Sequence, residues 1–95
     1  MILEVAILHI IPVQEPAFEA AFRRAIPILS GTSGYISHEL RRSIEHENRY
    51  ILLVQWQTLE DHTVGSPQYQ EWKALLHHFY DPFPTVEHYA APLAP

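Results

Sequence analysis

The chain has 95 residues, with 6 Lys and Arg against 11 Asp and Glu, so its formal net charge is −5 with neutral histidines. This length fits one domain over residues 1–95. A domain of this size buries only about 60–68% of its unfolded surface, so we expect it to gain stability by forming a homodimer. The acidic balance and the lack of a basic stripe argue against nucleic acid as a partner.

Cysteine is absent from the chain, which excludes a disulfide framework, a thiolate nucleophile and thiolate metal ligands. This composition suits a cytoplasmic protein. The apolar N-terminus contains Glu4 and is far shorter than the ~20 residues of a membrane helix. It also lacks the basic start and the cleavage site of a signal peptide. We therefore expect this segment to stay in the mature protein, and we expect no membrane partner.

The first half of the chain predicts a strand followed by a helix. Ile2–Ile11 carries apolar residues on both alternating faces, which is typical of a strand that is covered on both sides. Apolar residues recur at helical spacing from Phe18 to Leu29, after Pro16 at a position that suits the first helical turn. Pro27 is expected to end or kink this helix.

A hairpin and a second helix are expected next. The second strand, Tyr35–Ser43, has polar residues on one face and pairs with a third strand at Tyr50–Gln57. Thr58 and Asp61 predict a short capped turn, and Ser66-Pro67 predicts the start of a broken helix.

The chain ends with a short predicted strand at Thr85–Tyr89, after two prolines that stop the helix. Residues 90–95 are expected to form an irregular C-terminal arm. The order β-α-β-β-α-β is that of a ferredoxin-like α+β sandwich, with two helices on one face of a four-stranded antiparallel sheet. The other sheet face would expose many apolar side chains. Packing sheet to sheet in a homodimer, as in a dimeric α/β barrel, would cover them.

Several short motifs occur in a characteristic order: LEVAILHIIPVQEPAFEAAF from Leu3, the Gly34-Tyr35-Ile36 start of a strand, VQWQTLEDH from Val54, SPxYxxW from Ser66, and VEHY from Val86. Over nearly its whole length the chain resembles the antibiotic biosynthesis monooxygenase (ABM) family of dimeric ferredoxin-like proteins. The resemblance implies a homodimer with a small-molecule pocket between helices and sheet in each subunit.

Known activities in this family are diverse. Some members resemble cofactor-free monooxygenases of aromatic compounds, others degrade haem or isomerise small phosphorylated sugars, and others have no assigned activity. We expect an oxidoreductase of the cofactor-independent monooxygenase type, acting on a small aromatic or quinol-like compound without a cofactor. The alternative is a non-catalytic ligand-binding or stress-response dimer.

The haem-degrading branch is disfavoured. The resemblance implies that members of this branch have an Asn on the first strand, a Trp on the third strand and a helical His that binds iron. Trp56 matches the tryptophan, but by our alignment Ile7 and Lys73 stand at the other two positions, with His77 one turn further along. Two of the three residues are therefore missing.

Trp56 and His62 are the predicted catalytic residues. Cofactor-free oxygenation needs a base and an apolar pocket that excludes water. The imidazole of His62 titrates near neutrality, which suits a base. The indole of Trp56 can stack on a flat substrate or donate a hydrogen bond to a developing oxyanion. The alternatives are that Trp56 fills the core and that His62 caps or packs the turn.

His38, Tyr69 and His88 are the predicted substrate-binding residues. His38 and His88 lie on predicted strands and face the cavity only if the strand registers turn them inward, because a slip of one residue reverses the face. Tyr69, in the first turn of the second helix, could bring its hydroxyl to the cavity mouth. The adjacent His77 and His78 point about 100° apart on a helix and cannot hold one metal ion together. We therefore expect no metal site.

Overall fold

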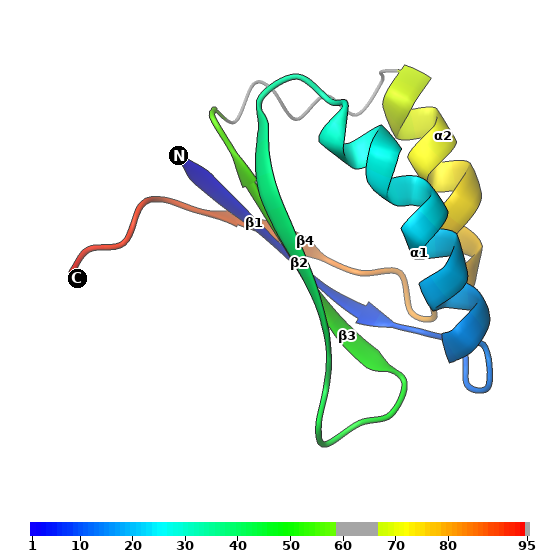
Figure 1. Cartoon of the computed structure of the whole chain (residues 1–95). Coiled ribbons are helices and arrows are strands. Elements are labelled where there is room, and N and C mark those ends of the chain that lie inside the picture. The colour runs from blue at the N-terminus through cyan, green and yellow to red at the C-terminus, as the bar shows by residue number, and fades with distance from the viewer. Residues whose placement is uncertain (59–66, 95) are drawn as a thin grey trace.

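Two helices lie side by side against one face of a four-stranded antiparallel sheet in the computed structural model, which describes residues 1–58 and 67–94 (Figure 1). The strand order across the sheet is β2-β3-β1-β4. The ferredoxin-like α+β class predicted from the sequence is confirmed. The elements are β1 (Ile2–His9), α1 (Glu15–Ser30), β2 (Tyr35–Arg42), β3 (Arg49–Trp56), α2 (Pro67–Leu76), the 3-10 turn η2 (His77–Phe79) and β4 (Val86–Tyr89).

The register of the central strand pair decides which residues face the helices. Ile2 of β1 lies opposite Trp56 of β3, and Ala6 lies opposite Leu52. Because side chains alternate along a strand, the even-numbered residues of both strands share the covered face. Apart from the partly buried Ile2, these residues are at most 7% exposed: Glu4, Ala6, Leu8, Tyr50, Leu52, Val54 and Trp56.

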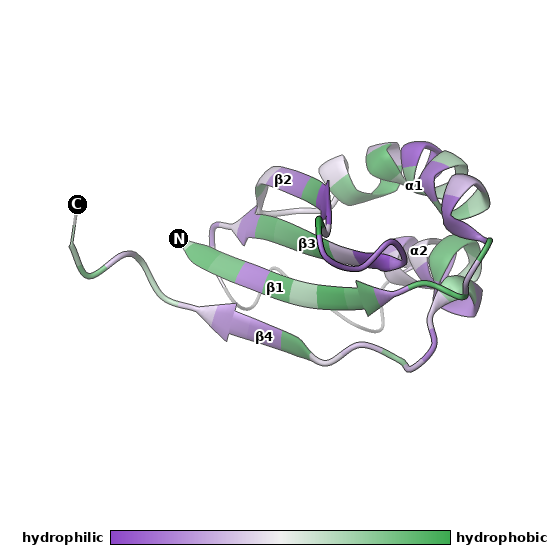
Figure 2. Cartoon of the chain, turned by 90° about the horizontal axis from the view of Figure 1, so that it is seen from below, coloured by the Kyte–Doolittle hydropathy of each residue, from purple (hydrophilic) through white to green (hydrophobic). Residues whose placement is uncertain are grey.

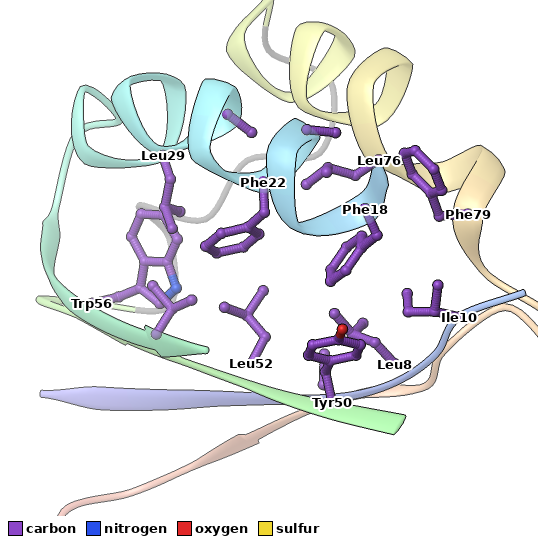
Figure 3. Close-up of a cluster of buried hydrophobic side chains, with 14 residues drawn as sticks. Leu8, Ile10, Phe18, Phe22, Leu29, Tyr50, Leu52, Trp56, Leu76 and Phe79 are labelled. Atoms are coloured by element: carbon purple, nitrogen blue, oxygen red, sulfur yellow. The ribbon is translucent and has the colours of Figure 1, made fainter. Parts of the chain in front are cut away.

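Phe18 lies at the centre of the core that forms between this face and α1 (Figure 3). Its side chain is fully buried. The ring centroid lies 5.0 Å from that of Tyr50 and 5.9 Å from that of Phe79, in edge-to-face geometry that aromatic pairs favour. The buried residues of α1 recur at the spacing of one helical stripe, as predicted: Phe18, Ala21, Phe22, Ala25 and Leu29.

Pro27 does not end α1, which was one of the two outcomes expected from the sequence. The helix continues to Ser30, and the Gly31 backbone N–H donates a 3.0 Å hydrogen bond to the Pro27 carbonyl. Proline removes the hydrogen bond to the carbonyl four residues earlier, which belongs to Arg23. Arg23 and Pro27 both lie on the exposed side of α1, where water can satisfy that carbonyl. The proline is therefore tolerated near the end of the helix.

The predicted hairpin is confirmed as the antiparallel pair of β2 and β3. A bulge between Tyr35 and Ser37 shifts the register, and from there His38 lies opposite Val54. The outer face of β2 is polar, as predicted: Glu39 and Arg41 form an exposed ion pair of 2.6 Å. Such an exposed pair contributes little stability.

The sheet face away from the helices is not covered by any element in the described part of the chain (Figure 1). Hydrophobic residues lie along β1 and β3, whereas β4 is largely hydrophilic (Figure 2). Among the described residues, no helix combines the length and apolar character that crossing a bilayer requires. The side chains on this open face include Leu3, Val5, Ile7, Ile51 and Leu53, all of which are partly or largely exposed.

Candidate active site

A cavity of about 280 Å³ lies between the sheet and the two helices. This volume is near the lower end of the ~300–1,000 Å³ that is typical of ligand pockets, so it suits a small compound. Its floor is the covered face of β1 and β3, and α2 supplies Tyr69 and Trp72 to the wall. Both tryptophans of the chain, Trp56 and Trp72, line it. No lysine or arginine is found among the described lining residues.

Glu4 places a buried carboxylate in this cavity. Only 7% of the residue is exposed, and its Oε1 accepts a hydrogen bond of 2.9 Å from the indole Nε1 of Trp56. Burial of a carboxylate is costly unless hydrogen bonds stabilise it. A carboxylate has about four lone-pair sites for such bonds. The bond from Trp56 therefore fixes the orientation of this carboxylate in the cavity wall.

His88 of β4 lies beside Glu4. The two residues are direct partners in the antiparallel pairing of β1 and β4, so their side chains share a face and their Cβ atoms are about 4.5–5.5 Å apart. Both line the cavity. His88 differs in being exposed to solvent at the edge of the sheet. This pairing therefore connects a buried carboxylate to a group that water can reach.

The other end of the cavity contains His77 within a set of aromatic rings. The His77 ring centroid lies 4.9 Å from that of Phe83, 5.5 Å from Tyr80 and 5.8 Å from Tyr69. Burial, and to a lesser extent the positive charge of Lys73, lowers the pKa of His77 below its ordinary value. Burial likewise raises the pKa of Tyr80. At neutral pH both groups are uncharged.

Backbone hydrogen bonds hold the segment after α2 against the end of β1. The Ile11 N–H donates to the Phe79 carbonyl over 2.9 Å, and the Asp81 N–H donates to the His9 carbonyl over 2.8 Å. These bonds fix η2 and the residues that follow it next to the sheet. They therefore fix the ring set around His77 as one wall of the cavity.

The predicted site residues fall into three groups. Trp56, Tyr69 and His88 line the cavity. His62 lies outside the described residues. His38 is not among the lining residues: its Nδ1 shares a 2.6 Å hydrogen bond with the hydroxyl of Tyr35. β2 is the strand furthest from β4, so His38 lies on the side of the sheet away from His88.

Trp56 lies both in the core and in the cavity lining. It is 2% exposed and belongs to the core cluster, where it lies near Leu29 (Figure 3). It also lines the cavity and holds Glu4. Its indole N–H is directed at this carboxylate, so donation to a substrate oxyanion is not its principal contact.

Sequence reasoning did not identify Glu4 or His77 as site residues. The available signal for Glu4 was one acidic residue within an otherwise apolar strand, at a position that shares its face with Ala6 and Leu8. Ile7, which stands where the haem-degrading pattern has its Asn, lies on the open face of the sheet. Its side chain therefore points away from the cavity.

Known proteins resemble this chain over most of its length. The family model described as antibiotic biosynthesis monooxygenase matches residues 1–75. The Bacillus subtilis protein YczJ, described as uncharacterised, is 59% identical over 92 residues, covering 94% of this chain and 97% of its own length.

Solved structures share the fold. A crystal structure of an antibiotic biosynthesis monooxygenase family protein from Bordetella bronchiseptica has 34% sequence identity and a TM-score of 0.91, over 97% of both chains. SnoaB, a cofactor-independent oxygenase from Streptomyces nogalater, has a TM-score of 0.76 at 18% identity, over 98% of this chain and 94% of its own. With a family match across most of its residues, this chain belongs to the antibiotic biosynthesis monooxygenase family.

Proposed function

We propose that this protein is a cofactor-independent monooxygenase of a small, uncharged aromatic diol, bound in the cavity between helices and sheet. Membership of the family supports the monooxygenase type of reaction. The observation that carries the proposal is the composition of the cavity, which is walled by both tryptophans and by apolar side chains. A flat aromatic compound matches such walls, since stacked and edge-to-face ring contacts add to the burial of apolar surface.

The reaction balances without a cofactor if the substrate supplies all the electrons. One molecule of an aromatic diol and one of O2 give a hydroxyquinone and one molecule of water. One oxygen atom replaces a ring hydrogen, and the other leaves as water. The diol loses four electrons in total, and these reduce O2. The protein therefore has to bind the ring, exclude water and accept a proton.

In this scheme Trp56 and Tyr69 hold the ring. Trp56 presents an indole fixed by its hydrogen bond to Glu4, and Tyr69 contributes to the opposing wall on α2. The assignment of His62 as a base stays a prediction from the sequence, because that residue lies outside the described part of the chain.

The protein is further proposed to act as a homodimer that packs sheet to sheet. The open face of β1 and β3 carries Val5, Ile7 and Leu53. Apolar patches of this kind on a soluble protein mark interaction sites. A second copy of the chain offers the same surface and so can cover this one around a two-fold axis.

Oxygen uptake in the presence of 1,4-dihydroxynaphthalene tests the proposed activity. The rate above spontaneous oxidation should depend on the protein. It should fall strongly in Ala6→Leu, which places a larger side chain on the cavity floor. Ala17→Leu, on the exposed side of α1, is the matched control and should leave the rate unchanged. Binding of the diol without any added oxygen uptake would favour a non-catalytic ligand-binding protein.

A further inference from the structure

We propose that Glu4 is the proton acceptor of this cavity and that His88 passes the accepted proton to solvent. This assignment rests on the proposed function. It names a catalytic residue, Glu4, that would contact the substrate, and a relay residue, His88, that would act through it.

The position of Glu4 suits a proton acceptor. Its carboxylate is buried on the cavity floor and fixed by the 2.9 Å bond from Trp56. A general base has to stand within hydrogen-bond reach of the proton that it removes. A diol that stacks on Trp56 with one hydroxyl at the N–H edge of the indole would place that hydroxyl beside Glu4, because the carboxylate is held at this edge.

Charge also favours an uncharged substrate with a hydroxyl directed at Glu4. The described cavity wall contains this carboxylate and no lysine or arginine. An aromatic acid or a phosphorylated compound would place a second negative charge beside a buried one, which is strongly unfavourable at low local dielectric. A hydroxyl instead donates a charge-assisted hydrogen bond to the carboxylate. The substrate class is therefore neutral phenols and diols.

His88 offers the route by which the proton leaves. It is the direct cross-strand partner of Glu4 and also lines the cavity, but it is exposed at the sheet edge. When the ring is oxidised, the substrate O–H bond breaks and its proton moves to a carboxylate oxygen of Glu4. The proton then moves to the imidazole of His88 and from the imidazolium to water. Solvent returns a proton when the second oxygen atom leaves as water, so the overall reaction releases no net proton. Glu4 is a carboxylate again, and no electrons are exchanged with the protein.

Anaerobic binding tests the contact without requiring turnover. Trp56 and Trp72 both line the cavity, so quenching of tryptophan fluorescence reports occupancy. The wild type should bind 1,4-dihydroxynaphthalene at least about tenfold more tightly than 1,4-dimethoxynaphthalene, which has no proton to donate. Glu4→Gln should reduce this preference, whereas Glu71→Gln, an exposed glutamate of α2, should preserve it. Equal preference in the wild type and Glu4→Gln overturns the assignment.

Turnover tests the acceptor role. Glu4→Gln can still accept the bond from Trp56 but is a poor base, so kcat for oxygen uptake should fall on the order of 10²- to 10⁴-fold. Glu4→Asp should recover part of it. Full activity in Glu4→Gln, with activity lost in His62→Ala, places the base at His62 and overturns the assignment while the proposed function stands. If the wild type takes up no oxygen but its binding preference depends on Glu4, the proposed function is rejected and the contact between Glu4 and the bound diol stands.

Chemical rescue tests the relay. His88→Ala should lower kcat, and added imidazole should restore much of it, because the position is open to solvent. A loss through altered structure alone would not respond to imidazole. His78→Ala, another exposed histidine outside the cavity lining, is the control and should keep wild-type activity. A wild-type rate in His88→Ala, or a loss that imidazole does not restore, overturns the relay role.

Discussion

The indole Nε1 of Trp56 donates a 2.9 Å hydrogen bond to the buried carboxylate of Glu4, which joins two neighbouring strands on the covered face of the sheet. Glu4 lies directly opposite Val54, so Trp56 is its diagonal neighbour on β3. This contact links the hydrophobic core to the candidate active site.

Removing the donor should destabilise the fold. Trp56→Phe keeps an aromatic ring but leaves Glu4 without this bond, which should lower the free energy of unfolding by about 1.5–3 kcal/mol. A double-mutant cycle with Glu4→Leu, which removes the acceptor, should give a coupling energy of at least about 0.5 kcal/mol by urea unfolding. If the two substitutions change the free energy of unfolding additively, the bond does not contribute to stability.

Phe18 should be among the most sensitive core positions. It is fully buried and its ring contacts Phe22, Tyr50, Phe79 and Tyr80. Phe18→Ala removes these contacts and leaves a cavity, so the free energy of unfolding should fall by about 3–5 kcal/mol. Ile44→Ala, at a position that is 95% exposed, should change it by no more than about 0.5 kcal/mol. Similar effects at both positions would contradict the described core.

Stability should decline in mild acid partly because of His77. Burial lowers the pKa of its imidazole in the folded protein, so the unfolded chain binds more protons below the ordinary value of about 6.5. The contribution is complete above that pH and is lost progressively as the pH falls towards the lowered pKa. His77→Leu should therefore reduce the dependence of unfolding free energy on pH between neutral and mildly acidic conditions.

The control for this prediction is His46→Leu, at an exposed histidine in the turn between β2 and β3. Chemical unfolding at a series of pH values measures both variants. An unchanged pH dependence in His77→Leu would mean that the ring set around His77 does not bury it as described.

Disrupting the open sheet face should produce monomers. Leu53 lies between Val5 of β1 and Glu39 of β2 on that face. Leu53→Glu introduces a charge into the proposed interface, where an unpaired buried charge is strongly unfavourable. Light scattering coupled to gel filtration should show a dimer for the wild type and a monomer for this variant. Ile44→Glu, outside the strands, should remain dimeric, and a monomeric wild type would reject the proposed assembly.

The sequence predicted the fold well because the hydrophobic patterns of its elements are clear. The apolar run of Ile2–Ile11, which covers both faces of a strand, and the helical stripe from Phe18 to Leu29 identify β1 and α1. The end of α1 was predicted less accurately, because a proline is tolerated where solvent can satisfy the freed carbonyl, as at Pro27.

The candidate site was only partly predictable, since it depends on which strands are neighbours. His38 and His88 look alike in the sequence, but β2 and β4 occupy opposite edges of the sheet. Only His88 therefore reaches the cavity. Glu4 was recognised as an interruption of an apolar strand, but its role depends on the register that brings it to Trp56 and His88. Cross-strand register is a tertiary property that a single sequence does not specify.

The most direct test of the central claim is the isotopic composition of the product formed from 1,4-dihydroxynaphthalene under oxygen gas enriched in the heavy isotope. A monooxygenase of the proposed type should form a hydroxynaphthoquinone that carries one heavy oxygen atom, at a rate that requires the protein and falls strongly in Ala6→Leu. Unlabelled naphthoquinone as the sole product, or labelled product at a rate independent of the protein, would contradict the proposed activity.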